Sequence, residues 1–429
     1  MVSGVVRVVI IEARYGKVEL ANGSRVNDPL LLATLAPLQG RQVISQTELD
    51  HTLLLMSDIP GVAVNATLRP GQATGSSDLL VNAAQSGPAM LGNVTLDNAG
   101  NRYTGRMRAG GSVNFIDPLH HGDILSANLL SSGSGMNYGR LAYDTLLNGK
   151  GTRVGGSWSA LRYALGEPLA ALDAHGTAQV ASLWGKHTLV RSRDVNLYGQ
   201  IQFDKLQLHD RIDTSAMRTD RHLNNWTMSV IGDERDAFLA GGVTTWNVGA
   251  SVGRVGFDDG PAQLADAATA QTRGAFSKWN ANVIRLQGLS PKNSLYLAFA
   301  AQGASGNLDS SQKISAGGPY TVRAYDVALL SGDSGYVGTA ELRRDLGWAW
   351  NGQWQAVVFV DGAHVTVNKS TWVAGANSAT LTGAGAGLNW TGAQQWSARI
   401  AVAAPLGTRP ALAADGASAR AWGELSRGF

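Results

Sequence analysis

From residue 89 onward, apolar residues recur at every second position, which is the period of a β-strand with two differently exposed faces. In residues 354–361, Trp354, Val358 and Val360 share one face, whereas Gln355 and Asp361 lie on the other. The second face consists mainly of Gly, Ala, Ser, Asn and Gln along most of these strands. A soluble sandwich would fill its inner face with Leu, Ile and Phe, so the pattern predicts strands between lipid and a wide, wet lumen.

Sixteen such strands can be counted, which predicts a mainly β protein built on a 16-stranded antiparallel transmembrane β-barrel. Longer polar stretches at 211–221, 258–273 and 305–334 are expected to be loops. The last is the longest connection between strong strands, so it is expected to have a task of its own. The strands are expected to start near residues 89, 102, 123, 135, 151, 177, 194, 222, 240, 274, 293, 335, 352, 378, 394 and 417.

Residues 1–87 have a different pattern, which predicts a small α+β domain before a barrel over residues 88–429. Asp28 before Pro29 is a good N-cap and first-turn pair for one helix. Ser45 with Glu48 forms a capping box for a second helix. The expected order is strand, helix, helix, strand, strand, over residues 5–11, 29–38, 45–57, 62–68 and 78–84.

Composition supports an envelope barrel and excludes several other classes. The chain has 53 Gly and 12 Trp among 429 residues and only 16% charged residues, which suits lipid-facing strands with aromatic girdles. It has no Cys, and its net charge of +3 gives no reason to expect a nucleic-acid partner. The sequence has no run of 18 or more apolar residues, so no transmembrane helix is expected. The first residues lack the pattern of a signal peptide, so we expect a mature or truncated form.

Two motifs that could indicate catalysis or metal binding lack the structural context that such sites require. Residues 249–253 match the G-x-S-x-G elbow, but they lie within a regular strand rather than at a strand-to-helix turn. His120 and His121 are adjacent in a short turn, and no third metal ligand is evident. We therefore expect neither an enzyme nor a metal or cofactor site.

The connection at 305–334 resembles the inward-folded loop of the TpsB family, the outer-membrane transporters of two-partner secretion, which are related to BamA-like barrels. The matching residues are Gly318, Pro319, Val322, Arg323, Ala324, Tyr325 and Asp326 in the loop, followed by Phe359, Asp361 and Gly362 in a later strand. The N-terminal residues Glu12, Arg14, Tyr15, Pro60 and Gly61 are similar to the barrel-proximal POTRA domain of that family, and the C-terminal aromatic Phe429 resembles a barrel-assembly signal. The family's first POTRA domain, its plug helix and its signal peptide have no counterpart in this sequence.

The resemblance implies a monomeric pore in the bacterial outer membrane, with the POTRA domain in the periplasm and a loop that gates the lumen. It implies that the pore secretes an unfolded partner exoprotein of the haemolysin, adhesin or filamentous haemagglutinin kind. Its other partners would be outer-membrane lipid and the barrel-assembly machinery. Two alternatives stay open: a BamA-like assembly factor for outer-membrane proteins, and a simple outer-membrane pore.

Strand parity adds an expectation about the loop arginine. Because Val358 and Val360 face lipid, Asp361 faces the lumen, where an arginine from a folded-in loop needs a counterion. We therefore expect an ion pair between Arg323 and Asp361 that pins the loop to the wall. Ala324 stands where the family normally has Gly, so its backbone would be strained if that position has a positive φ.

Overall fold

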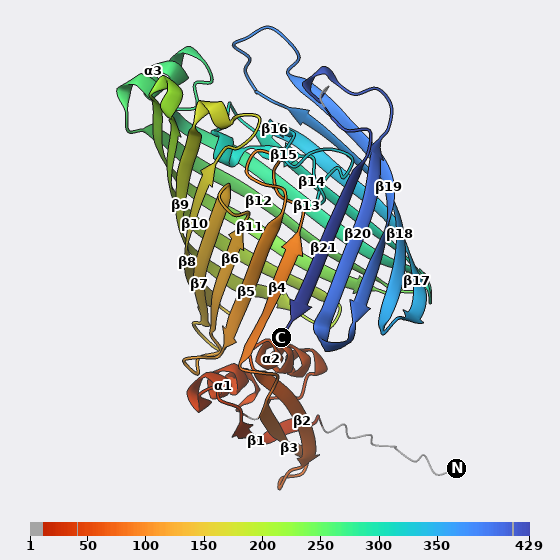
Figure 1. Ribbon diagram of the computed structural model, residues 1–429. Helices are drawn as coiled ribbons and strands as arrows, with labels where there is room; N and C mark the ends of the chain where they lie inside the picture. Colours follow the sequence, from red (N-terminus) through yellow and green to blue (C-terminus); the bar gives the residue numbers. More distant parts are fainter. Residues whose placement is uncertain (1–11, 41, 414–415) are drawn as a thin grey trace, which may run out of the picture.

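The computed structural model describes residues 12–40, 42–413 and 416–429. They form a large β-barrel with a small α+β module at one end (Figure 1). The expected strand over residues 5–11 lies outside the described residues. Among the residues described, no helix is long and apolar enough to cross a membrane.

Within the described residues, sixteen strands form one closed barrel in which neighbours in the chain are neighbours in the sheet. The last strand pairs with the first, antiparallel like every other pair, so the expected barrel is confirmed. The strands are β4 (Met90–Asp97), β5 (Arg108–Ile116), β6 (Ile124–Ser131), β7 (Met136–Leu146), β8 (Arg153–Ala164), β9 (Ala174–Arg191), β10 (Val195–Ile212), β11 (Met217–Asp236), β12 (Gly242–Phe257), β13 (Gly274–Ser290), β14 (Asn293–Ala304), β17 (Ser334–Ala349), β18 (Gly352–Thr366), β19 (Ser378–Gly392), β20 (Trp396–Pro405) and β21 (Arg420–Gly428).

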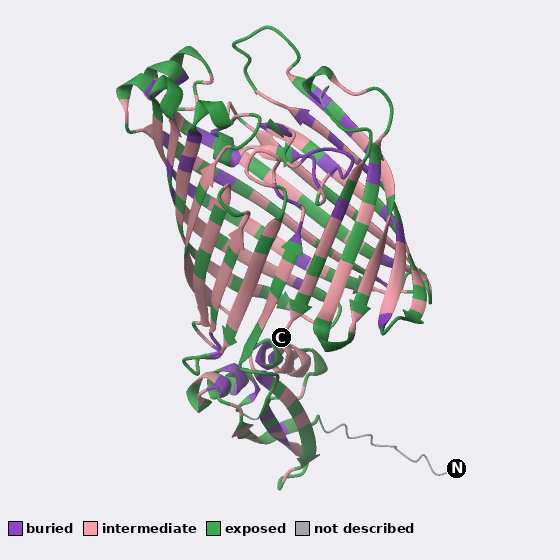
Figure 2. Ribbon diagram, viewed as in Figure 1, coloured by how far each residue is buried: buried purple, intermediate pink, exposed green. Residues whose placement is uncertain are grey.

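Exposure alternates along the barrel strands, as Figure 2 shows. On β18, Val358 and Val360 are each 53% exposed on the outer face, whereas Asp361 is only 1% exposed. The N-terminal module contacts one end of the barrel, which we call the near end, and we call the opposite end the far end. There, Gly260–Ala268 forms helix α3, and short 3-10 turns cover 170–172, 213–215 and 411–413, whereas the 3-10 turn at 393–395 lies at the near end.

The expected loop at 211–221 is wrong. β10 continues to Ile212 and β11 begins at Met217, so this polar stretch is two paired strand ends joined by a tight turn. Its charged residues pair across the two strands, as in the Arg211–Asp220 bridge of 2.7 Å. Polar residues on both faces suit strands that project beyond the apolar belt.

The N-terminal module has the expected element order, but its first strand is β1 (Arg14–Gly23). Helices α1 (Asp28–Leu35) and α2 (Gln46–Ser57), with a 3-10 turn at 36–38, precede strands β2 (Val62–Pro70) and β3 (Ser76–Gln85). The sheet order is β1-β3-β2, with β1 parallel to β3. The fully buried core side chains Leu31, Leu35, Leu38, Met56 and Val81 join the helices to the sheet.

Two helix caps differ from expectation. Asn27, not Asp28, caps α1, because its side chain accepts the Leu30 N–H at 3.0 Å. The Asp28 carboxylate instead accepts from the Asn22 amide at 2.7 Å. Ser45 occupies the N-cap position of α2 but makes no side-chain cap bond, so the expected capping box is wrong.

The module is joined to the turns at the near end of the barrel by charged contacts. The Arg191 guanidinium, at the end of β9, donates to both carboxylate oxygens of Asp58, at 2.7 and 2.8 Å. Arg193 reaches Asp50 at 2.7 Å. Bidentate pairing fixes orientation as well as distance, so these contacts set the orientation of the module relative to the barrel.

The connection between β14 and β17 folds into the barrel (Figure 1). It contains a 3-10 turn at 310–312 and two short antiparallel strands, β15 (Ile314–Ala316) and β16 (Leu330–Gly332). An apolar cluster ties it to the wall, with Val322, Tyr325 and Leu330 against Val357 and Leu381. The expected long loop of 305–334 is therefore a packed part of the lumen.

The module's core generates a stability prediction. Met56→Ala removes a fully buried side chain and should lower the free energy of unfolding of the module by about 2–5 kcal/mol. Trypsin cleavage of the module along a urea titration measures it. The control is Leu68→Ala on β2, where the side chain is 44% exposed and the change should stay within about 0.5 kcal/mol. Equal urea midpoints for Met56→Ala and wild type would contradict the packing described.

Candidate functional site

The tip of the folded-in loop is a tight turn that presents Arg323. Gly317 and Gly318 have φ of 107° and 103°, which only glycine adopts readily. The Gly318 N–H donates to the Tyr325 carbonyl at 3.1 Å, and the Tyr325 N–H donates to the Val322 carbonyl at 3.1 Å. A Cβ on Gly317 would collide with the Asp326 carbonyl oxygen, so the turn requires glycine there.

Arg323 is held by two carboxylates on two adjacent strands. Its Nε and Nη2 donate to Asp361 of β18 at 2.8 and 2.7 Å, and its backbone N–H donates to the same carboxylate at 3.0 Å. Its Nη1 donates to Glu341 of β17 at 2.6 Å. Thr339 gives Asp361 a fourth donor at 2.7 Å. The expected Arg323–Asp361 pair is present, and Glu341 is a second partner.

The side chains of this group are largely buried, and their surroundings hold the geometry. The Arg323 side chain is 10% exposed, Asp361 is 0% and Glu341 is 11%. The guanidinium carbon lies 3.3 Å from the centre of the Phe359 ring, which is a cation–π contact. The Trp422 indole N–H donates to the Arg323 carbonyl at 2.7 Å. A charge buried in this way is stable only while its partners stay in place.

Asp326 ties the loop to a different part of the wall. Its carboxylate accepts from Arg106, in the β4–β5 connection, at 2.9 Å and from Arg420, at the start of β21, at 2.5 Å. Arg102 lies 3.8 Å away. Asp326 is 5% exposed, so one buried carboxylate faces three guanidinium groups.

Ala324 is unstrained, because positive φ in this turn falls on Gly317, Gly318 and Ala328 instead. It is 1% exposed, and a Cβ built on Gly383 of the wall would lie 2.5 Å from its methyl group. Gly383 is directly paired with Asp361 in the sheet. The absence of a side chain at Gly383 therefore leaves space for the Ala324 methyl group.

The other loop residues of the motif divide between packing and the lumen. Val322 and Tyr325 are buried in the apolar cluster, and Pro319 lines a cavity of about 430 Å³ beside Arg323. Tyr320 also lines this cavity and donates its hydroxyl to Glu424 at 3.3 Å. Gly362 is not part of the site, because strand alternation places it on the outer face with Val360.

The expected recognition residues of the module do not form one surface. Tyr15 is a core residue, 1% exposed, and burial raises the pKa of its phenol, with the Glu48 carboxylate adding to the effect. Pro60 and Gly61 lie at the joint, where a Cβ on Gly61 would touch the Ile116 side chain at 3.4 Å. Glu12 and Arg14 are exposed, and Pro60 and Gly61 are half-buried, so of these five residues Tyr15 is the one that is closed to a partner.

Phe429 completes the closure of the barrel. Its N–H donates to the Gly92 carbonyl at 2.9 Å, and its carbonyl accepts the Gly92 N–H at 3.0 Å. Its ring lies over Gly92, where a Cβ would approach the ring to 2.5 Å. Arg427, which interrupts the apolar alternation of the last strand, lies over the Trp396 ring at 5.5 Å.

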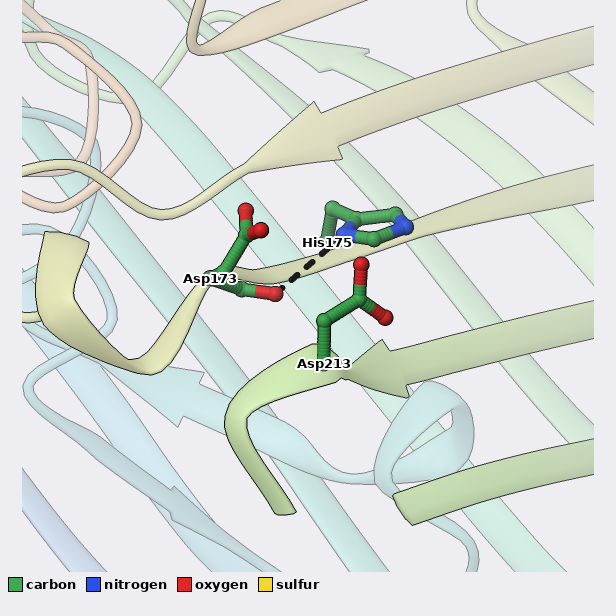
Figure 3. Close-up of side chains that lie close together, drawn as sticks. All are labelled: Asp173, His175 and Asp213. Carbon is green, nitrogen blue, oxygen red and sulfur yellow. Dashed lines mark hydrogen bonds between the residues drawn. The ribbon is translucent and has the colours of Figure 1, made fainter. Parts of the chain in front are cut away.

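A separate group, Asp173, His175 and Asp213, lies at the far rim (Figure 3), with its ligand atoms within 4.8 Å of one another. His175 Nδ1 also lies 3.3 Å from the Asp173 carbonyl. Both aspartates are exposed and the histidine is half-buried, and exposed acidic groups are common without an ion. This group carries no metal assignment.

Comparison with known proteins identifies the family. Residues 75–390 match the model of the haemolysin secretion/activation proteins ShlB/FhaC/HecB. The chain belongs to this family. It is therefore an outer-membrane transporter that secretes a partner protein, and the assembly-factor and simple-pore alternatives are not favoured.

Individual relatives agree with the family match. The heme/hemopexin transporter protein HuxB of Haemophilus influenzae is 24% identical over 408 residues, which cover 94% of this chain and 72% of HuxB. The structure of CdiB from Escherichia coli is similar with a TM-score of 0.80 at 20% identity, covering 98% of this chain and 77% of CdiB. BamA from Haemophilus ducreyi lacking POTRA domains 1–3 gives 0.62 at 13% identity, over 96% of this chain and 84% of that one. These structures support the shared fold.

Several residues of this transporter's loop site were absent from the sequence prediction. Glu341 lies opposite Phe359 in the β17–β18 register, so strand parity would have placed it on the lumen face. Strand parity also puts Arg420, Trp422 and Gly383 on the lumen face, but which loop residues they and Arg106 contact depends on the path of the loop.

The Ala324–Gly383 contact generates a paired prediction. Gly383→Ala should push the loop tip off the wall, because the new methyl group meets the Ala324 methyl at 2.5 Å. Limited proteolysis of the transporter in detergent, scored by cleavage within residues 317–329, should show faster cutting. Ala324→Gly in the same chain should restore protection. Equal cutting of Gly383→Ala and wild type would show that the loop does not pack as described.

Proposed function

We propose that the loop of residues 305–334 is the gate of this transporter and that the N-terminal module is a POTRA domain that receives the partner protein in the periplasm. The partner would be a large exoprotein of the haemolysin, adhesin or filamentous haemagglutinin kind that crosses as an unfolded chain. The observation that carries the proposal is the buried Arg323 group. It fixes a removable segment across a lumen that is otherwise lined by small and polar side chains.

The loop is anchored unevenly, which suits a gate. At its base, Asp309 pairs with Arg221 of β11 at 2.6 Å, and Lys313 pairs with Asp333 at 3.1 Å. At its tip, the Arg323 group joins it to β17 and β18. Releasing the tip while the base stays paired would swing the segment aside without unfolding the barrel. The tip is therefore the point at which opening is controlled.

The module offers a sheet edge for an extended chain. In the part of the chain that is described, no strand pairs with the outer edge of β2, and α2 lies beside this strand. The start of β1 is already covered, since Tyr15 N–H donates to the Gln42 carbonyl at 3.0 Å. An unfolded exoprotein adding to β2 would gain backbone hydrogen bonds with little demand on its sequence.

The gate is tested by Arg323→Ala and Asp361→Ala in the transporter as it exists in the outer membrane. Each leaves a buried charge without its partner, which should weaken loop docking by about 3–5 kcal/mol. Single-channel recordings should show larger and more frequent openings, and co-expression with the cognate exoprotein should show altered secretion into the medium. Wild-type conductance and secretion from both variants would remove the proposal.

The matched control for the gate is Asp204→Ala. Asp204 is a lumen-facing carboxylate on β10 that accepts from Ser182 at 2.6 Å and Gln202 at 2.8 Å but does not contact the loop. It should leave conductance near wild type. If Asp204→Ala opened the pore as much as Asp361→Ala, loss of any lumen charge would explain the effect.

The recognition edge is tested by photo-crosslinking. A photoreactive amino acid at Asn65, exposed on β2, should capture the cognate exoprotein during secretion. The same amino acid at Leu32, exposed on α1, is the control and should capture much less. Capture at Leu32 but not at Asn65 would show that the chain binds the helical side instead.

A further inference from the structure

The seam between the last and first strands has the shortest ladder of the barrel. β21 and β4 pair over five residues, from Glu424↔Asp97 to Gly428↔Asn93. Their neighbours β20–β21 and β4–β5 each pair over eight, and β10–β11 over eighteen. The ladder stops at Glu424, so residues 420–423 of β21 continue toward the far end without regular strand pairing to β4.

Above this ladder, the seam is continued by one asparagine. The Asn98 N–H donates to the Gly423 carbonyl at 3.2 Å, and its side chain accepts the Gly423 N–H at 2.8 Å. Its amide nitrogen also donates to the Ala421 carbonyl at 3.0 Å. Beyond Asn98, Arg420 of β21 and Arg106 of the β4–β5 connection lie on opposite sides of the seam and contact the same carboxylate, with Arg102 nearby.

The loop supplies the only carboxylate that the described contacts place between these arginines. Asp326 reaches Arg420 at 2.5 Å on one side of the seam and Arg106 at 2.9 Å on the other. The Asn101 amide, in the β4–β5 connection, donates to the Val327 carbonyl at 3.0 Å. Arg420, Trp422 and Glu424, at every second position of β21, contact Asp326, Arg323 and Tyr320 of the loop. The loop thus binds both sides of the seam.

We propose that Asp326 makes the closure of the barrel depend on the position of the loop. With the loop in place, its carboxylate attracts guanidinium groups from the last strand and from the first hairpin toward one point. When the loop leaves, the same arginines face each other without a counter-charge and repel across the seam. Displacement of the gate therefore loosens the far end of the seam, which lets the barrel widen as a chain passes. This inference rests on the proposed gating role of the loop.

The test is hydrogen exchange of the full chain in lipid nanodiscs, with Asp326→Asn as the variant. Losing charge-assisted hydrogen bonds across the seam should speed exchange in residues 98–106 and 420–424 by about tenfold or more. Amides of Gly92 and Phe429, at the other end of the same seam, should keep their wild-type rates. The matched control is Asp204→Asn, which removes a lumen carboxylate far from the seam. Unchanged exchange at 420–424 in Asp326→Asn would overturn the proposal.

Two further variants separate repulsion from general loop damage. Arg106→Gln in the Asp326→Asn chain removes one of the opposed charges and should recover much of the protection at 420–424. Failure to recover it would overturn the repulsion. Asp361→Asn, which frees the loop tip without altering the arginines, should also speed exchange at 420–424. If Asp361→Asn opened the pore yet left this exchange unchanged, the coupling would fall while the gate would stand.

Discussion

The position of the folded-in loop depends on one buried cation. The Arg323 guanidinium is removed from bulk water inside the lumen, and two carboxylates on neighbouring strands, with the Phe359 ring beneath it, replace the lost solvation. A buried pair of this kind adds little stability over an apolar substitute, but breaking it from one side costs several kcal/mol. The interaction therefore contributes little to the net stability of the barrel, but it determines where the loop can lie.

Other residues of the lumen wall fit the same position of the loop tip. A sixteen-stranded barrel is too wide for its own side chains to fill, which leaves room in the lumen for the folded-in loop. Val322 and Tyr325 pack on the wall, and Gly383, which pairs with Asp361 in the sheet, leaves room for Ala324. Shape and charge thus select the same position for the tip, and any shift of the tip loses both together.

The loop has a second connection to the barrel wall through Asp326. Asp326 holds arginines from the last strand and the first hairpin, at the barrel's shortest ladder. When the Asp326 carboxylate leaves, Arg106 and Arg420 lose the counter-charge that they share. The module, by contrast, is joined to near-end turns by Asp58–Arg191 and Asp50–Arg193, away from the gate contacts. The contacts that hold the module and the contacts that hold the loop tip are therefore separate sets of ion pairs.

The sequence by itself determined the local features of this protein. Alternation with a period of two gave the strands and their number, because each strand separates lipid from lumen along its own length. The same parity put Asp361 on the lumen face, and the loop motif supplied Arg323 as its partner. Where local signals were weak or ambiguous, prediction failed: Asn27 rather than Asp28 caps α1, and 211–221 is paired strand rather than loop.

Only the tertiary structure decided which distant residues meet. Glu341 became the second counterion through the register of β17 on β18, and Tyr15 became a core residue through the fold of the module. Gly383, Arg106 and Arg420 joined the site because the loop crosses the lumen to reach them. Parity fixes which face a side chain occupies. The path of a loop across a lumen is instead a balance of non-local charge and packing, which no short stretch of sequence contains.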